Sequence, residues 1–269
     1  MASVIVERHK GVFEITLNRP DVLNAVNREA IAELAAAVAE AAEDRTARAV
    51  LLQGAGSHFC AGGDITMFGE LIRLSSEDRR KALYSIVDSL HPLLIRMRHM
   101  PKPVVAAVQG AAAGFGLSLV LAADLALAGE NTVFTSGYIL LGTSPDGGMT
   151  ATLARSVGLK HAAELMFLGD RFDARRAMEL GLINRIVPAE KLSAEAKGLA
   201  RRLAGGTDPC LRANQDSDPG DFGRRVRRAA EARDREFCRL RRYRGFRRGR
   251  ARFSREAGAR IHRGWMRSQ

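Results

Sequence analysis

Two glycine-rich stretches carry most of the information in this chain: Phe59-Cys60-Ala61-Gly62-Gly63-Asp64-Ile65 and Gly110-Ala111-Ala112-Ala113-Gly114-Phe115-Gly116. Each follows an apolar run that predicts a buried strand. Glycine and alanine have little or no side chain, so a ligand can approach the peptide plane closely. The pattern predicts two loops that direct two backbone N–H groups at one small negative charge. We expect that charge to be an oxyanion.

Length and charge divide the chain into two parts. The 269 residues can bury a full core, as one large domain or as a domain with an appendage. Residues 1–200 hold 21 Lys+Arg and 22 Asp+Glu, whereas residues 201–269 hold 21 Arg, no Lys and 8 Asp+Glu. We therefore predict a core domain over residues 1–204 and an atypical, Arg-rich C-terminal region over residues 205–269.

The chain shows no targeting or metal-binding pattern. No apolar run is long and pure enough to predict a membrane span, and the N-terminus lacks the basic and apolar regions of a secretory signal. Cys60, Cys210 and Cys238 have no metal-ligand spacing, so we expect reduced thiols in a cytoplasmic protein. We expect no membrane contact and no bound metal.

Strand and helix patterns alternate along the core domain, which predicts the α/β class with a largely buried sheet. A turn at Gly11 predicts a hairpin of the strands around it. Predicted strands cover residues 4–6, 12–17, 49–53, 104–108, 124–128 and 183–187. Predicted helices cover residues 28–44, 76–99, 147–155, 173–180 and 192–203, with Asp173 as an N-cap and Gly181 as a C-cap.

Four motifs in order resemble one known family. They are Leu17-Asn18-Arg19-Pro20 with Leu23-Asn24-Ala25, the first glycine loop, Ala106-Ala107-Val108-Gln109-Gly110 through Asp124, and Leu180-Gly181-Leu182-Ile183-Asn184-Arg185-Ile186-Val187-Pro188. Over about residues 4–204 the chain resembles the crotonase, or enoyl-CoA hydratase/isomerase, superfamily. The resemblance implies the crotonase fold, a spiral of ββα turns with a C-terminal helical region. It also implies homotrimers or hexamers.

The resemblance implies an acyl-coenzyme A thioester as the substrate, with no permanently bound cofactor. Carried over position by position, the oxyanion donors are the N–H groups of Gly63 and Phe115. Phe115 begins the predicted small-residue helix, where free N–H groups and the helix dipole both favour an anion. The backbone of Ala61, Gly62, Gly63, Asp64 and Ile65 would hold the adenine end of coenzyme A. The loop at Asn24 and Ala25 would flank the pantetheine.

The two glutamates of the family's hydratases are missing. At their positions this chain has Ser118 and Tyr138. An unperturbed tyrosine has a pKa of about 10, so neither side chain suits a general base near neutral pH. Water addition by two carboxylates is therefore disfavoured, and a hydratase would have to position its water through Ser118 or Tyr138.

Asp146, in Ser144-Pro145-Asp146-Gly147-Gly148, is the remaining carboxylate near the expected pocket. Its position resembles that of the proton-shuttling aspartate in the family's dienoyl-CoA and ring-epoxide isomerases. A single carboxylate suffices for isomerisation, because it can take a proton from one carbon and return it to another. A second interpretation stays open, in which Asp146 caps the following helix.

The C-terminal region does not show the helices that usually cover the acyl pocket. We interpret it as translation in a shifted reading frame, with the break near residues 206–208. Read one base later, Phe237-Cys238-Arg239-Leu240 and the residues after it can encode a sequence similar to the usual family ending.

The leading functional hypothesis is an enoyl-CoA isomerase that shifts a double bond or opens a strained ring, with Asp146 as acid and base. We expect such an enzyme to act in fatty acid metabolism. A weak enoyl-CoA hydratase is the enzyme alternative. Two further alternatives are not enzymes: a catalytically silent coenzyme A-binding protein, and an RNA-binding homologue that uses the Arg-rich region. We rank the last lowest and expect no nucleic-acid partner, because few aromatic residues lie among the arginines.

Overall fold

The computed structural model describes residues 1–206. The rest of the predicted C-terminal region, including the proposed shift of reading frame, lies outside the described residues. The described part is an α/β structure with two sheets. The larger sheet has the strand order β1-β2-β3-β4-β6-β9. Its strands are β1 (Val4–His9), β2 (Val12–Leu17), β3 (Ala49–Gly54), β4 (Val104–Val108), β6 (Leu125–Gly129) and β9 (Arg185–Val187).

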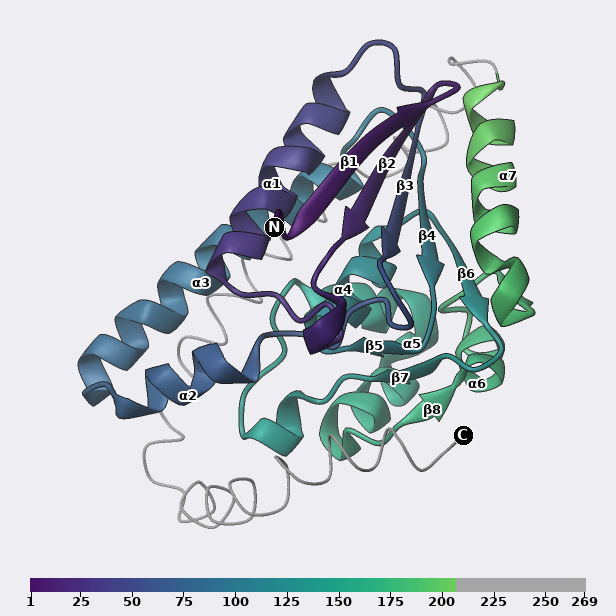
Figure 1. Ribbon diagram of the computed structural model, residues 1–269. Helices are drawn as coiled ribbons and strands as arrows, with labels where there is room; N and C mark the ends of the chain where they lie inside the picture. Colours follow the sequence, from purple (N-terminus) through teal and green to yellow (C-terminus); the bar gives the residue numbers. More distant parts are fainter. Residues whose placement is uncertain (207–269) are drawn as a thin grey trace.

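The larger sheet is parallel except at its first strand, where β1 and β2 form the predicted hairpin. The α-helices are α1 (Arg28–Glu43), α2 (Ile65–Arg73), α3 (Ser76–Arg98), α4 (Phe115–Ala122), α5 (Met149–Leu168), α6 (Ala174–Glu179) and α7 (Leu192–Ala204). The short 3-10 helices are η1 (Pro20–Val22), η2 (Tyr138–Leu141) and η3 (Ala189–Lys191). Figure 1 shows α1 and α3 on one side of the sheet and α7 on the other.

Alternation along the strands explains this layering. Successive side chains of a strand point to opposite faces, and both faces of this sheet are covered. Phe13 and Ile15 face the core that α1 and α3 complete. Val12 and Leu51 face the other way, into the smaller core beneath α7. That helix contributes every fourth residue to the smaller core: Leu192, Ala196, Ala200 and Ala204.

The smaller sheet has the order β5-β7-β8, with strands β5 (Ala111–Ala113), β7 (Val133–Thr135) and β8 (Phe172–Asp173). The second glycine stretch was expected to be a loop, and the prediction was wrong for residues 111–113. These residues form β5, which pairs in parallel with β7 on one side. On the other side Ala112 forms a bridge with Cys60. The smaller sheet therefore fixes the position at which α4 begins.

Most predicted elements are confirmed within two residues at each end, but the first strand continues past the predicted residue 6 to His9, and one helix and one cap also differ. The helix predicted over residues 147–155 continues to Leu168, across a non-helical Gly158 with φ of +77°. The last predicted strand begins only at Arg185, because the residues before it turn out of α6. Gly181, with φ of +76°, follows the C-cap residue Leu180. The N-cap at Asp173 is confirmed.

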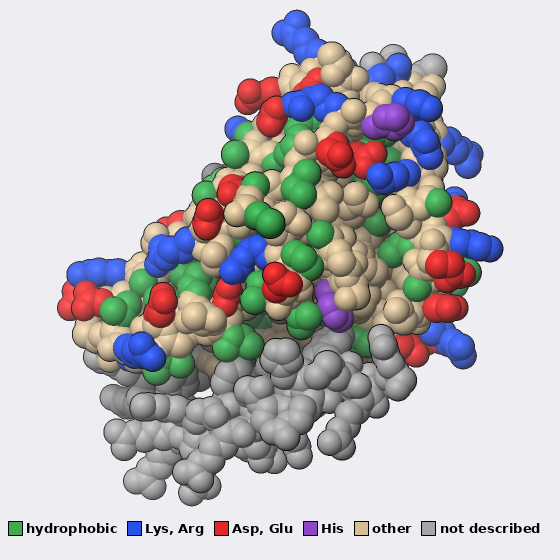
Figure 2. Space-filling model, in the orientation of Figure 1, with side chains coloured by type: hydrophobic (Ala, Val, Ile, Leu, Met, Phe, Trp, Pro, Cys, Tyr) green, Lys and Arg blue, Asp and Glu red, His purple; other side chains and the backbone are tan. Residues whose placement is uncertain are grey.

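Two surface features follow from the described residues. None of their helices is both long enough and apolar enough to cross a bilayer. Acidic and basic side chains are interspersed on the face shown in Figure 2, and apolar side chains lie between them. This face of the described core therefore has mixed charge.

Candidate active site

The first glycine loop is anchored by a short parallel pairing between Val26 and Gly63. The N–H of Val26 donates to the carbonyl oxygen of Gly62 at 2.8 Å, and the N–H of Asp64 donates to the carbonyl oxygen of Val26 at 2.9 Å. In such a bridge both hydrogen bonds flank Gly63, so the N–H of Gly63 itself points away from Val26. Within residues 1–206 that N–H has no hydrogen-bond acceptor.

The second glycine stretch runs directly beside the first. The N–H of Cys60 donates to the carbonyl oxygen of Ala111 at 2.9 Å, and the N–H of Ala113 donates to the carbonyl oxygen of Cys60 at 3.0 Å. Gly114 then adopts φ of +51° and ψ of −118°, a conformation that favours glycine, and Phe115 starts α4. The first N–H groups of a helix have no partner inside the helix. The N–H of Phe115 donates to no acceptor in the described part of the chain.

The two predicted oxyanion donors belong to adjoining segments. A Cβ placed on Gly62 would lie 3.0 Å from the carbonyl oxygen of Ala113 and 3.7 Å from the nitrogen of Phe115. A Cβ on Gly114 would lie 3.8 Å from the Cα of Gly62. The structure thus brings Gly63 and Phe115 close together, each with an N–H that no described residue accepts. Two such donors can hold one oxyanion.

Tyr138 and Asp146 lie on the side of this site formed by η2 and the start of α5. A Cβ on Gly114 would be 3.8 Å from Cζ of Tyr138, which places the tyrosine ring against the second loop. The hydroxyl of Tyr138 donates a hydrogen bond to Oδ1 of Asp146 at 2.6 Å. Ser118 Oγ lies 3.4 Å from the backbone oxygen of Asp146. Sequence analysis considered Ser118 and Tyr138 together and Asp146 separately, whereas the structure brings all three side chains together.

Burial keeps the Tyr138 hydroxyl protonated. The side chain is 8% exposed. Its pKa is raised well above the usual 10, first by burial and then by the negative charge of Asp146 and the hydrogen bond to it. A hydrogen bond with Ser118 acts in the opposite direction. Tyr138 is therefore a hydrogen-bond donor at neutral pH and does not act as a base.

The interpretation of Asp146 as a helix cap is wrong. Helix α5 begins at Met149, its N-cap residue is Gly148, and no side chain makes a capping hydrogen bond there. The backbone oxygen of Asp146 accepts a hydrogen bond from the N–H of Met149 at 3.0 Å. The carboxylate turns instead toward Tyr138. The helix start therefore does not explain the position of this carboxylate.

The side chain of Asn24 supports the loop expected to flank the pantetheine. Asn24 is 2% exposed and has φ of +55°. Its amide nitrogen donates to the carbonyl oxygens of Ala55 at 2.9 Å and His58 at 2.6 Å, and its Oδ1 accepts from the N–H of Arg19. A ligand would thus meet the backbone of this loop rather than the Asn24 amide. Ala25 is buried beside it.

Arg19 ties this loop to the first glycine loop, a role that the sequence reading missed. Its Nη1 donates to Oδ2 of Asp64 at 2.9 Å and to the carbonyl oxygen of Ala25 at 2.5 Å. Burial alone would raise the pKa of Asp64, but hydrogen bonds from Thr66 N–H and from Arg19 outweigh it, and the pKa is lowered. Asp64 also caps α2 through Thr66. Ile65, at the start of that helix, is 45% exposed.

His58, which is partly buried, and Cys60, which is fully buried, contact the second glycine stretch. Nδ1 of His58 accepts a hydrogen bond from the N–H of Ala111 at 3.1 Å, and burial lowers the pKa of this histidine. Cys60 is fully buried, and burial raises the pKa of its thiol to about 12. A thiol with this pKa is a poor nucleophile at neutral pH. Cys60 is thus a buried packing residue beside the loops.

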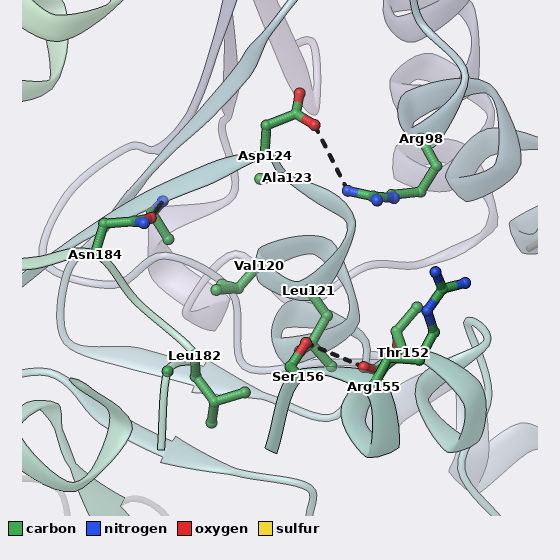
Figure 3. Close-up of a pocket in the computed structure, with 12 residues that line it drawn as sticks. Arg98, Val120, Leu121, Ala123, Asp124, Thr152, Arg155, Ser156, Leu182 and Asn184 are labelled. Carbon is green, nitrogen blue, oxygen red and sulfur yellow. Dashed lines mark hydrogen bonds and ion pairs between the residues drawn. The ribbon is translucent and has the colours of Figure 1, made fainter. Parts of the chain in front are cut away.

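A separate cavity of about 220 Å³ lies at the opposite end of α4. Figure 3 shows Arg98 directed at Asp124, an ion pair of 3.6 Å, with Thr152, Arg155 and Ser156 on α5 nearby. This cavity contains none of the predicted site residues. Within residues 1–206 no group of His, Cys, Asp and Glu has a metal-binding arrangement.

Comparisons with known proteins agree with this geometry. A family model described as enoyl-CoA hydratase/isomerase matches residues 7–257. A 1,2-epoxyphenylacetyl-CoA isomerase of Escherichia coli is 38% identical over 204 residues, which cover 76% of this chain and 77% of that protein. A short-chain-enoyl-CoA hydratase of Clostridium acetobutylicum is 33% identical over 75% of both chains.

A crystal structure of an enoyl-CoA hydratase from Mycobacterium avium subsp. paratuberculosis matches with a TM-score of 0.78 at 30% identity. The match covers 93% of this chain and 98% of that chain, so the described core has the crotonase fold. The expected fold class is thereby confirmed. The chain belongs to the enoyl-CoA hydratase/isomerase family of the crotonase superfamily, whose members process acyl-CoA thioesters.

Proposed function

We propose that this protein is an enoyl-CoA isomerase that uses one aspartate, Asp146, as acid and base. The observation that carries the proposal is the composition of the site. Two carboxylates lie at the glycine loops: Asp64 is held by Arg19 and by the N–H of Thr66, whereas Asp146 accepts a hydrogen bond from Tyr138. The positions of the family's two glutamates hold Ser118 and Tyr138. The 1,2-epoxyphenylacetyl-CoA isomerase among the relatives supports isomerase chemistry.

The proposed reaction begins with proton removal. The carboxylate of Asp146 takes a proton from the α-carbon of a 3-enoyl thioester, and the electron pair of that C–H bond moves into the thioester carbonyl. The resulting dienolate carries its negative charge on the thioester oxygen. The N–H groups of Gly63 and Phe115 would hold this oxygen. Each such donor can lower the barrier by about 2.7–4 kcal/mol.

The second half returns the same proton. The Asp146 carboxyl donates it to the γ-carbon, the electrons of the oxyanion re-form the carbonyl, and the double bond moves into conjugation with the thioester. No water is consumed, so atoms and electrons balance within the substrate. The phenol of Tyr138 stays protonated throughout, because its pKa is raised well above neutrality.

The surroundings of the loops fit a coenzyme A thioester. The backbone of residues 61–65 and the loop at Asn24 and Ala25 would hold the coenzyme. Arg19 keeps these two segments at a fixed separation through Asp64 and Ala25. The isomerase would need no further cofactor.

Product analysis with two substrates tests the proposed reaction. The purified protein should convert a trans-3-enoyl-CoA into its conjugated 2-enoyl isomer, followed by the rise in absorbance of the conjugated thioester. It should hydrate crotonyl-CoA at least 100-fold more slowly, because it lacks the pair of carboxylates. Faster hydration than isomerisation would overturn the proposal in favour of a hydratase. Tight binding of acyl-CoA with neither reaction would identify a catalytically silent binding protein.

A further inference from the structure

Tyr138 stands where a hydratase of this family has a glutamate, and the structure gives it a different connection. Its hydroxyl donates a hydrogen bond to Oδ1 of Asp146 at 2.6 Å; the tyrosine is buried and the aspartate is partly buried. Hydrogen bonds to a charged acceptor are shorter and stronger than neutral ones. A carboxylate held in this way has a restricted rotation about its last side-chain bond.

The backbone on both sides of this hydrogen bond is also fixed. Gly147 has φ of +59°, and a Cβ there would stand 2.8 Å from Oγ of Ser118 and 3.0 Å from Cδ1 of Leu94. The N–H of Tyr138 donates to the carbonyl oxygen of Ser136 at 2.9 Å, which orders the start of η2. Both ends of the Tyr138–Asp146 pair therefore rest on tightly packed segments. The hydroxyl is held where it can act as a fixed donor.

We infer that Tyr138 is a positioning residue that locks the Asp146 carboxylate in one orientation, so that the proton taken from the substrate returns to it before exchanging with water. The inference rests on the proposed isomerase function. A carboxylic acid that rotates freely can turn its proton toward solvent and lose it. A carboxyl whose Oδ1 remains bound to Tyr138 stays over the substrate between removal and return. Tyr138 would thus determine what fraction of the removed protons returns to the substrate instead of exchanging with water.

The Tyr138→Phe variant tests this inference, because it removes the hydroxyl and keeps the ring that packs against Gly114. We expect kcat for isomerisation to fall by about 10- to 100-fold with KM unchanged, the usual scale for one hydrogen bond to a charged group. In D2O, the deuterium content of the product should rise severalfold over wild type. Unchanged kcat together with unchanged deuterium content would overturn the inference.

Ser136→Ala is the matched control. Its hydroxyl donates a buried hydrogen bond of 2.7 Å to the carbonyl oxygen of Leu165, in the same segment but away from Asp146. A variant that only loosens this segment should leave the deuterium content at the wild-type value. Equal deuterium gain in Ser136→Ala and Tyr138→Phe would assign the effect to general loosening and reject the positioning role.

An Asp146→Asn variant distinguishes a failure of the proposed isomerase function from a failure of the positioning role of Tyr138. Full activity in Asp146→Asn would reject the proposed function itself. An inactive Asp146→Asn combined with wild-type behaviour in Tyr138→Phe would leave the function standing and reject only the positioning role.

Discussion

Gly116, in the first turn of α4, lies against the backbone carbonyl of Cys60 so closely that a Cβ on Gly116 would stand 2.2 Å from that oxygen. The contact joins the helix that begins at Phe115 to the loop that carries Gly63. The distance between the two proposed oxyanion donors is therefore set by a backbone contact that excludes any side chain. This relationship explains why the chain uses glycine inside a fully buried helix.

A methyl group at this contact should separate the two loops. We expect Gly116→Ala to lower the free energy of unfolding by roughly 1–3 kcal/mol, the scale of overpacking in a close-packed interior. It should also lower kcat, because the N–H of Phe115 moves away from the N–H of Gly63. Urea unfolding and isomerase kinetics measure the two effects. Gly69→Ala is the control: no atom lies within 4 Å of a Cβ there, and the change should be neutral or stabilising by up to about 1 kcal/mol.

The stability of the loops should depend on pH through His58. Burial holds the pKa of folded His58 below the usual value of 6.5, and protonation would abolish the acceptor that binds the N–H of Ala111. Below pH of about 6.5 the unfolded chain binds a proton that the folded chain does not, so stability falls as the pH drops from 6.5 toward the folded-state pKa.

His58→Asn isolates this effect. The amide oxygen of asparagine can accept from Ala111 at nearly the same place and does not titrate. We expect the fall in stability between pH 7 and pH 5 to be smaller in His58→Asn than in wild type, as measured by urea unfolding at each pH. An equal or larger fall in the variant would show that other groups cause the dependence.

Arg19 should act mainly on substrate binding. Removing its side chain in Arg19→Ala releases Asp64 and Ala25 together, which detaches the loop beside the expected pantetheine from the first glycine loop. We expect KM for the acyl-CoA to rise by about 10-fold, with stability lower by roughly 1–2 kcal/mol. Arg19→Lys keeps the charge but cannot serve both acceptors equally, so it should be intermediate. Steady-state kinetics that show a loss in kcat alone would contradict the assignment.

The predicted homotrimer or hexamer has a candidate contact surface. Ile139, Leu140, Phe167 and Leu168 are exposed by 49%, 63%, 73% and 55%, and Gly169 brings η2 and the end of α5 together. A charge at this surface should oppose association, so Leu140→Asp and Phe167→Asp should lower the mass in solution measured by light scattering. Met178→Asp, on α6, is the control. Unchanged mass in both variants, or a monomeric wild type, would contradict the prediction.

The sequence revealed the elements whose patterns are local. The hairpin at Gly11, the strand at residues 104–108 and the cap at Asp173 follow from periodicity and turn chemistry, and the structure confirms them. The close backbone approach of the two glycine stretches also follows from their small residues, although residues 111–113 of the second stretch form a strand and not a loop. Each of these features depends on residues near one another in the chain.

The remaining features depend on contacts between distant segments or on competing roles of one residue. Strand β5 forms because it pairs with the distant strand β7 and, at Ala112, with Cys60, and a three-residue strand leaves no periodic pattern. The hydrogen bond from Tyr138 to Asp146 was missed because tyrosine was considered only as a base or as a residue that positions water. His58 was passed over because a backbone N–H as its partner cannot be read from spacing.

The central claim is that Asp146 is the single acid and base. The rate of the double-bond shift in Asp146→Asn tests it most directly. Asparagine has nearly the same shape and can still accept from Tyr138, so folding and acyl-CoA affinity should be unchanged. With a trans-3-enoyl-CoA, kcat should fall by about 10²- to 10⁴-fold, the usual contribution of a general acid–base residue. The same change at exposed Asp170 should have no effect. Wild-type kcat in a folded Asp146→Asn would contradict the claim.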